Sequence, residues 1–127
     1  MIRKGRKYSL DEILPFVKSS FGKKGRINLD GDLVKVTSDR LFIFKQDHCC
    51  CNCGIAGVFF VKEKHSSGDV SFHLNLYAVS EDGEEILMTK DHIVPRSLGG
   101  KNHLNNYQTM CVRCNLEKGN EQVVEMG

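Results

Sequence analysis

The chain has 127 residues, the size of one ordinary domain, so we expect one compact unit with at most a short appendage. Hydrophobic residues make up 40% and charged residues 27%, which excludes a disordered chain, and no apolar run approaches the roughly 18 residues of a membrane span. The net charge is +2, yet residues 1–26 hold eight basic residues against two acidic ones, a net +6. This uneven charge suggests an arm for a polyanion, although a solvated charged surface explains such a run about as often.

The first seven residues are basic, but Ser9, Asp11 and Glu12 follow where a signal peptide has its apolar segment. We therefore expect no signal peptide and a cytoplasmic location. In that reducing compartment the six cysteines are interpreted as metal ligands before disulfides.

The N-terminal segment carries one helix signal. Ser9 and Glu12 have the spacing of a capping box, and apolar residues recur after them with a helical period, which predicts a helix from about residue 9 to 20. Pro15 lies too deep for the first turn and should kink this helix or split it, and residues 21–25 should end it. We interpret residues 1–30 as a basic helical arm and residues 31–127 as the main domain.

Strand signals fill the middle of the chain. Residues 33–37 and 41–44 predict a short hairpin, and three more strands are expected over 58–62, 70–79 and 86–90. In the 70–79 strand one face is apolar and should face the core, while His73 lies on the polar, solvated face. The apolar face consists of Phe72, Leu74, Leu76 and Ala78. Residues 91–108 are expected to be loop-like, and a short helix should run from about Cys111 to Gly119. The expected fold class is α+β.

Two pairs of cysteines indicate a metal-binding site. Cys50 and Cys53 form one pair with a two-residue gap, and Cys111 and Cys114 form a second. Two such pairs can close a tetrahedral four-cysteine site, because the short gap lets both sulfurs of a turn face one zinc ion. The alternatives are a redox dithiol or buried free cysteines, but no βαβ context surrounds either pair. The 57 residues between the pairs indicate a structural zinc that joins distant parts of a small sheet.

Cys49 and Cys51 are left over beside the first pair. A register in which either replaces Cys50 stays open, although only Cys50 with Cys53 gives the two-residue gap. The simplest reading of the spare thiols is that they bind no metal.

The most informative segment is Asp91-His92-Ile93-Val94-Pro95-Arg96-Ser97-Leu98-Gly99-Gly100, with Asn106 and then Cys111 to Gly119 behind it. It resembles the HNH endonuclease family, whose pattern D-H-I-x-P-x-S-x-G-G is followed by an Asn and by C-x-x-C-N-x-x-K-G. The resemblance covers about residues 50–119, and residues 1–46 lie outside it. It implies a small zinc-stapled ββα-metal core, here extended by further antiparallel strands, that hydrolyses DNA phosphodiester bonds.

The resemblance also implies roles for individual residues. His92 would be the general base, Asp91 and Asn115 would hold a catalytic divalent metal, and Asn106 would brace the loop that presents His92. The chemistry agrees, because an imidazole with a pKa of about 6.5 accepts protons at neutral pH and two oxygen ligands leave room for water and phosphate. Many family members have His where this chain has Asn115, and an oxygen ligand there shifts the expected metal towards Mg²⁺ or Mn²⁺.

Several points stay open at the level of sequence. Neighbours on a regular strand point to opposite faces, so Asp91 and His92 can serve one phosphate only if the strand ends or bends there. Arg96 and Lys118 could hold phosphates or be solvated. Four N-terminal cations are candidates for contacts with DNA: Arg3, Lys4, Arg6 and Lys7. The alternative is that the apolar side of the N-terminal helix docks on the core or on a partner protein, and that these charges belong to its solvated face. A partner such as a phage packaging component fits small proteins of this type, and the rival function is a zinc-dependent nucleic-acid-binding or regulatory module without turnover.

Overall fold

The computed structural model describes residues 1–19 and 24–126. Its seven strands are β1 (Ile2–Tyr8), β2 (Arg26–Leu29), β3 (Asp32–Lys35), β4 (Gly57–Lys64), β5 (His73–Val79), β6 (Glu85–His92) and β7 (Tyr107–Cys111). Its helices are α1 (Leu10–Ile13), α2 (Asp39–Gln46) and α3 (Val112–Met126), with 3-10 turns η1 (Leu14–Phe16), η2 (Arg96–Leu98) and η3 (Leu104–Asn106). No helix in these ranges is long and apolar enough to cross a bilayer.

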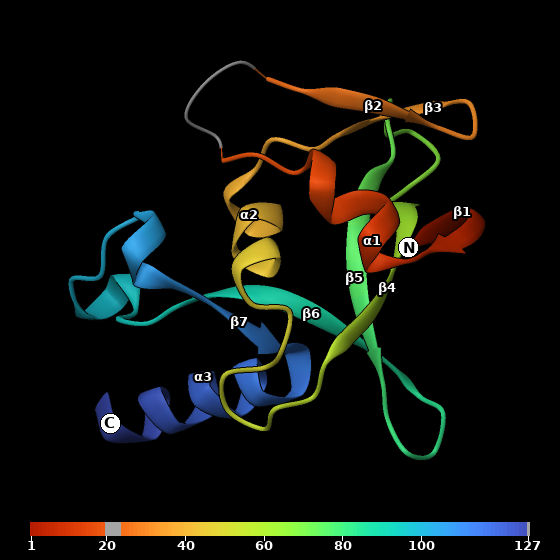
Figure 1. Ribbon diagram of the computed structural model, residues 1–127. Helices are drawn as coiled ribbons and strands as arrows, with labels where there is room; N and C mark the ends of the chain where they lie inside the picture. The colour runs from red at the N-terminus through yellow and green to blue at the C-terminus, as the bar shows by residue number, and fades with distance from the viewer. Residues whose placement is uncertain (20–23, 127) are drawn as a thin grey trace.

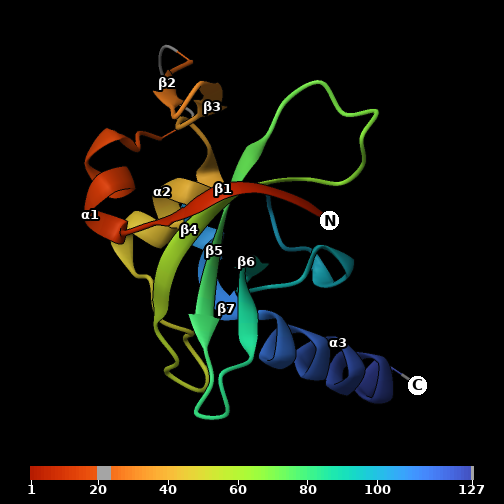
Figure 2. The same ribbon diagram turned by 90° about the vertical axis from the view of Figure 1, so that its right-hand side faces the viewer.

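The main sheet has five strands in the order β1-β4-β5-β6-β7, and every neighbouring pair is antiparallel. Strands β2 and β3 form a separate antiparallel hairpin. This hairpin and α3 lie at opposite ends of the molecule, and α2 runs between them beside the sheet (Figure 1). Turning the molecule shows α1 and α2 on one side of the sheet and α3 extending from β7 on the other (Figure 2). The expected α+β class is confirmed.

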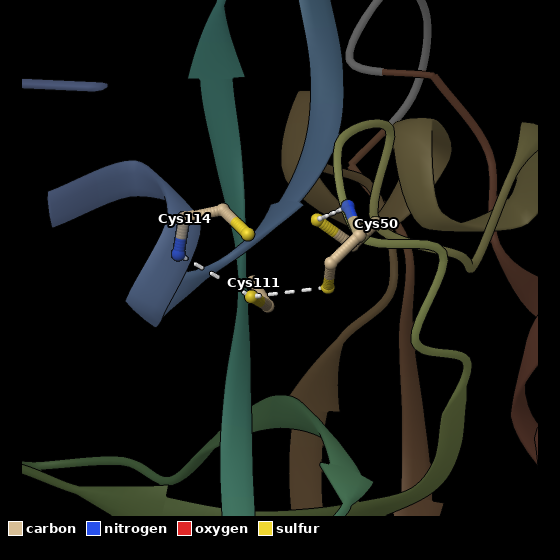
Figure 3. A group of neighbouring side chains, drawn as sticks. Cys50, Cys111 and Cys114 are labelled. Carbon is tan, nitrogen blue, oxygen red and sulfur yellow. Dashed lines mark hydrogen bonds between the residues drawn. The ribbon is translucent and has the colours of Figure 1, made fainter. Parts of the chain in front are cut away.

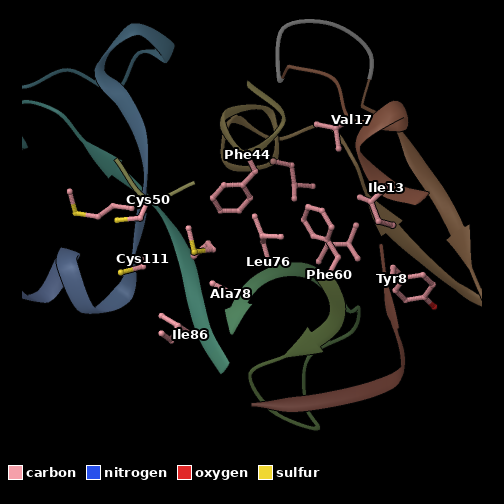
Figure 4. Packing of buried hydrophobic residues seen from close by; sticks show 14 of the residues in the cluster. Tyr8, Ile13, Val17, Phe44, Cys50, Phe60, Leu76, Ala78, Ile86 and Cys111 are labelled. Carbon is pink, nitrogen blue, oxygen red and sulfur yellow. The ribbon is translucent and has the colours of Figure 1, made fainter. Parts of the chain in front are cut away.

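The core lies between the sheet and α1 and α2. Phe44 of α2 and Phe60 of β4 are fully buried, and Leu76 and Ala78 of β5 point into the same cluster (Figure 4). Leu74, Leu76 and Ala78 are the alternating residues expected to face the core, so the expected inward face of this strand is confirmed. Burying such aliphatic and aromatic side chains contributes roughly 1.5–3 kcal/mol each, which is the main force that holds α2 against the sheet.

The hairpin expected over residues 33–37 and 41–44 is wrong. Strand β3 pairs with β2 instead, and residues 41–44 belong to helix α2. The Ser38 side chain accepts a hydrogen bond from the Leu41 backbone N–H and so begins the helix. Leu41 and Phe44 then lie one turn apart and are both buried, so tertiary packing overrides the strand preference of this aromatic and β-branched run.

The helical arm expected over residues 1–30 also needs correction. Residues 2–8 form β1, an edge strand paired with β4. The helix is limited to α1 and η1: its capping box between Ser9 and Glu12 is present, and Pro15 lies in η1, where the helix is split as expected. The expected end of this helix falls partly on residues 20–23, which lie outside the described residues.

The C-terminal third holds more regular structure than expected. Strand β6 extends to His92, and the supposed loop before Cys111 contains β7, which pairs with β6 from Met88 to His92. Helix α3 continues to Met126, so Gly119 does not cap it. The two strands and α3 form a β-β-α unit that contains the residues singled out above.

Candidate functional site

Four cysteines from two distant segments meet at the start of α3. The Sγ atoms of Cys50, Cys53, Cys111 and Cys114 all lie within 4.8 Å of one another. Sulfurs around a tetrahedral zinc ion, with Zn–S bonds of about 2.3 Å, lie about 3.8 Å apart, so a small contraction would close the site. Cys50 projects from the loop before β4, facing Cys111 and Cys114 at the β7–α3 junction (Figure 3). These four cysteines are positioned to form a metal site.

Local backbone structure explains why Cys50 and Cys53 can point at one ion. The chain turns tightly between them, with the Gly54 N–H donating to the Cys50 carbonyl, and Gly54 has a φ of 80°, a conformation that favours glycine. The backbone N–H of Cys53 points at the Cys50 sulfur, and that of Cys114 points at Cys111. Such N–H···S contacts stabilise thiolate ligands.

The cluster favours ionisation of one thiol and opposes it at others. Burial opposes ionisation of Cys50, but backbone N–H groups of Cys111, Cys53 and Asn52 outweigh it and lower the pKa of Cys50 to about 6. Burial raises the pKa of the Cys111 thiol to about 12. Four crowded thiolates repel one another unless a cation lies between them, so the donor set fits a thiophilic divalent ion such as zinc.

The spare cysteines lie outside this cluster. Cys49 pairs through its backbone with Ala56, and Cys51 donates its backbone N–H to the Thr109 carbonyl of β7. The Cys51 side chain is exposed, and neither thiol belongs to the group of four. The structure therefore groups Cys50, and neither Cys49 nor Cys51, with Cys53.

The same helix leads from the cysteine cluster to a second cluster. Asn115 directly follows Cys114, Lys118 lies one turn later on α3, and Asp91 and His92 are the last two residues of β6. Together they border an open hollow of about 300 Å³. The residues around it that matter here are Lys90, Asp91, His92, Arg96, Asn115 and Lys118. Asp91 and His92 both line the hollow, at the end of β6.

Asp91 is the buried acid of the hollow, with 7% of its surface exposed. Its Oδ2 accepts from Gln108 Nε2 at 2.9 Å and from Lys118 Nζ at 2.6 Å. Lys118 also donates to the His92 carbonyl at 2.6 Å, which joins α3 to the end of β6. Among the described residues nothing bonds Asp91 Oδ1, so one carboxylate oxygen is available to a ligand.

His92 is held from two directions. Its ring packs edge-on against Tyr107, with the ring centres 5.1 Å apart, and its Nε2 lies 2.8 Å from Asn102 Oδ1. An amide oxygen only accepts hydrogen bonds, so Nε2 donates, and Nδ1 of the neutral ring keeps its lone pair. This ring can therefore accept a proton through Nδ1.

Asn115 is oriented by a chain of hydrogen bonds. Its Nδ2 donates to Thr89 Oγ1 at 2.9 Å, and that hydroxyl donates to the Met110 carbonyl at 2.7 Å. Because the amide nitrogen is engaged on β6, the side-chain oxygen of Asn115 is the atom left to accept. Asp91 and Asn115 thus offer hard oxygen ligands, a donor type that suits Mg²⁺ or Mn²⁺.

Asn106 binds the loop that follows His92. Its side chain accepts from the Val94 N–H and donates to the carbonyls of Val94 and Lys101, while its own carbonyl accepts from the Ile93 N–H. Gly100 lies so close to this loop that a Cβ there would fall 1.7 Å from the Val94 carbonyl oxygen. The second glycine of the motif is therefore required by backbone packing.

The four N-terminal cations lie elsewhere and are called the β1 cations: Arg3, Lys4, Arg6 and Lys7. All four form ion pairs. Arg3 and Lys7 bind Glu85, the first residue of β6, whereas His92 is its last. Seven steps of about 3.3 Å along β6 put its two ends about 23 Å apart. None of the β1 cations lines the hollow, so the structure does not bring them to it.

Three residues around the hollow were missed by sequence reasoning: Thr89, Asn102 and Gln108. Thr89 and Gln108 face the site only because β6 pairs with β7, and this pairing depends on a strand that the sequence did not predict. Asn102 lies in the loop before η3 and contacts His92. The sequence feature that could have indicated this contact is that Asn102 follows His92 by only ten residues.

Comparison with known proteins agrees with this geometry. Residues 80–126 match the family model described as HNH endonuclease. Searches of the curated proteins and of the solved structures found no match. The matched segment runs from the residue after β5 through α3 and so contains Asp91, His92 and Asn115. Cys50 and Cys53 lie before it. The C-terminal segment of this chain, over residues 80–126, is therefore similar to the HNH endonuclease family.

Proposed function

We propose that this protein is a metal-dependent endonuclease that hydrolyses DNA phosphodiester bonds and leaves 5′-phosphate and 3′-hydroxyl ends. The observation that carries the proposal is the hollow at the end of β6, where a buried carboxylate, an imidazole with a free Nδ1 and an oriented amide lie together. Binding a nucleic acid alone does not need this combination. The match of the same segment to the HNH endonuclease family supports it.

His92 is the proposed general base. Its Nε2 donates to Asn102, so Nδ1 takes the proton from the attacking water. Tyr107 packs on the ring and limits its rotation, and Asn106 holds the loop behind it. These contacts fix the direction from which the proton is removed.

Asp91 and Asn115 are the proposed ligands of the catalytic Mg²⁺ or Mn²⁺. A divalent ion bound there would stabilise the negative charge that develops on the phosphate and the departing 3′ oxygen. Thr89 orients Asn115 and Gln108 orients Asp91, so both oxygens are positioned before any ligand enters. Arg96 and Lys118 border the same hollow and are proposed to contact the phosphates.

Cys50, Cys53, Cys111 and Cys114 are the proposed ligands of a structural Zn²⁺. A zinc ion there would tie the loop before β4 to the first turn of α3. Asn115 directly follows a proposed ligand, so zinc would also fix the place of one catalytic residue. We place the protein in the cytoplasm, where thiols stay reduced.

One observation favours a second candidate function. The Lys118 ammonium binds the carboxylate that would hold the metal, at 2.6 Å. A lysine in that place is compatible with a zinc-dependent nucleic-acid-binding module that has lost turnover. The two functions differ in whether the protein cuts DNA.

The test is incubation of the purified protein with supercoiled plasmid, with and without Mg²⁺ or Mn²⁺. Cleavage should require the metal, and His92→Ala should reduce the rate by about 10² to 10⁴, the usual contribution of a general base. His48→Ala is the matched control, since His48 lies outside the hollow, and it should cut normally. If His92→Ala keeps half the activity, the base lies elsewhere; if the unmodified protein never cuts, the binding module is the better description.

A further inference from the structure

The main sheet divides beside the catalytic hollow. Strand β5 pairs with β6 only from Tyr77 to Val79, opposite Glu85 to Leu87. From Met88 onward β6 pairs with β7 instead. The first half of β5, from His73, therefore separates from β6, and a gap opens between two strands of one sheet.

This gap is a groove of about 360 Å³. Four basic or titratable side chains line it: Arg40, His65, His73 and Lys90. The described residues that line it include no Asp or Glu, although Glu63 and Asp69 act electrostatically on His73 from nearby. Arg40 and Lys90 therefore give the lining of the groove a positive charge.

Arg40 lies in the groove without an acidic partner. It projects from α2, donates to the Leu74 carbonyl that β6 leaves unpaired, and lies 5.6 Å from the centre of the Phe44 ring. Among the described residues no carboxylate pairs with it, and burial lowers the pKa of this guanidinium. A largely buried cation of this kind is stabilised by an anion, and the planar guanidinium fork matches phosphate oxygens.

The groove adjoins the catalytic hollow. Lys90 lines both cavities, and its ammonium lies 4.1 Å from the centre of the Tyr107 ring. Alternate residues of a strand share one face, so Lys90 and His92 lie on the same face of β6. His65 and His73 also line the groove, with ring centres 5.7 Å apart and the two rings tilted by 42°. Side chains that can donate hydrogen bonds thus line a path from His92, the proposed base, to Arg40 of α2.

We propose that this groove, through Arg40, Lys90, His65 and His73, holds the phosphate backbone of the DNA strand that flanks the bond to be cut. The inference rests on the proposed function and names a substrate contact outside the segment that matches the family, since Arg40, His65 and His73 precede residue 80. Phosphate contacts position a strand without reading its sequence, so the groove orients the DNA and does not select it.

The test measures binding separately from cleavage. A short fluorescein-labelled DNA duplex is titrated with the zinc-loaded full chain in the His92→Ala background, and anisotropy gives Kd at several salt concentrations. Arg40→Gln should raise Kd about tenfold and reduce the slope of log K against log salt by about 0.9, the value for one phosphate contact. His65→Glu, which places a carboxylate at the exposed mouth of the groove, should raise Kd about threefold to tenfold.

Ser67→Glu is the matched control, because Ser67 is exposed in the same loop and does not line the groove. It should leave Kd within about twofold, since solvent screens its charge. If Arg40→Gln loses zinc or folded structure, His65→Glu decides alone. The proposal is overturned if the parent protein binds no DNA, if both groove variants stay within twofold, or if Ser67→Glu weakens binding as much as His65→Glu.

The outcomes also separate this inference from the proposed function. If the unmodified protein never cuts plasmid but the groove variants weaken binding, the groove stands and the nuclease proposal fails. If it cuts plasmid through His92 but the groove variants bind DNA normally, only the groove proposal fails.

Discussion

Lys118 gives the sharpest test of the proposed metal site. Its ammonium contacts both Asp91 Oδ2 and the His92 carbonyl at 2.6 Å, and the Asp91 side chain is only 8% exposed. Lys118→Met keeps much of the side-chain length and removes the charge. Without a metal, Asp91 is then left as a buried carboxylate with Gln108 as its remaining hydrogen-bond partner among the described residues. The variant should be less stable than the parent.

The loss of stability expected for Lys118→Met depends on how deeply the ion pair between Lys118 and Asp91 is buried. Removing one partner of a fully buried ion pair costs about 3–5 kcal/mol, and an exposed pair contributes about 1 kcal/mol or less. The Lys118 side chain is 22% exposed, which places this pair between those limits. We expect a loss of about 2 kcal/mol, or roughly 7 °C in Tm for a domain of this size.

A bound divalent cation should reverse the effect. Mg²⁺ at about 100 times its Kd stabilises a folded protein by about 2.7 kcal/mol, which exceeds the expected loss. Mg²⁺ should stabilise the parent protein less than the variant, because in the parent the ion must compete with the Lys118 ammonium for Asp91.

The assay is thermal unfolding of the zinc-loaded protein followed by circular dichroism, without and with increasing Mg²⁺. Asp91→Asn combined with Lys118→Met is the control, since it removes the charge that both cations would bind. The reasoning is refuted if Mg²⁺ raises the Tm of Lys118→Met and of the double variant equally.

Three further predictions concern other parts of the molecule. Cys53→Ser should lose zinc by elemental analysis and unfold at much lower temperature, because structural zinc contributes roughly 10–16 kcal/mol in small finger peptides; the neighbouring Cys51→Ser should keep both its zinc and its Tm. Asn115→Ala should raise the Mg²⁺ concentration for half-maximal plasmid cleavage by about tenfold or more, and an unchanged requirement would remove it as a ligand. Changing the β1 cations to Gln should lower Tm but leave the salt dependence of DNA binding unchanged, since acidic partners already occupy them; a slope flatter by about three units would instead mean that they hold DNA.

The parts of the structure that could be predicted from sequence depend on local chemistry. The cysteine pairs needed only a two-residue gap to be assigned to one cluster, and the capping box at Ser9 and the break at Pro15 depend on neighbours within one turn. The alternation of apolar and polar residues in β5 correctly predicted which face of this strand is buried. The motif from Asp91 to Asn115 placed its residues around one hollow, because strand β6, its loop and α3 form one β-β-α unit.

The errors arose where distant residues decide the structure. Strand β1 has no hydrophobic alternation, and its charges are satisfied by acids far along the chain, such as Glu63 and Glu85. Residues 41–44 have strand-forming side chains, but Ser38 begins a helix and the sheet buries Leu41 and Phe44. Such contacts appear only once the sheet is assembled.

The division of β6 between two partners has a consequence for local unfolding. Its first three residues are hydrogen-bonded to β5, whereas Met88 to His92 are held by β7 and α3. Parts of a protein that share few hydrogen bonds open separately, each with its own free energy. Amide hydrogen exchange should therefore divide within this one strand: protection near Glu85 should follow the global stability, and protection near His92 should follow occupancy of the cysteine cluster. The end of β6 that holds the proposed site would then open locally while the rest of the sheet stays folded.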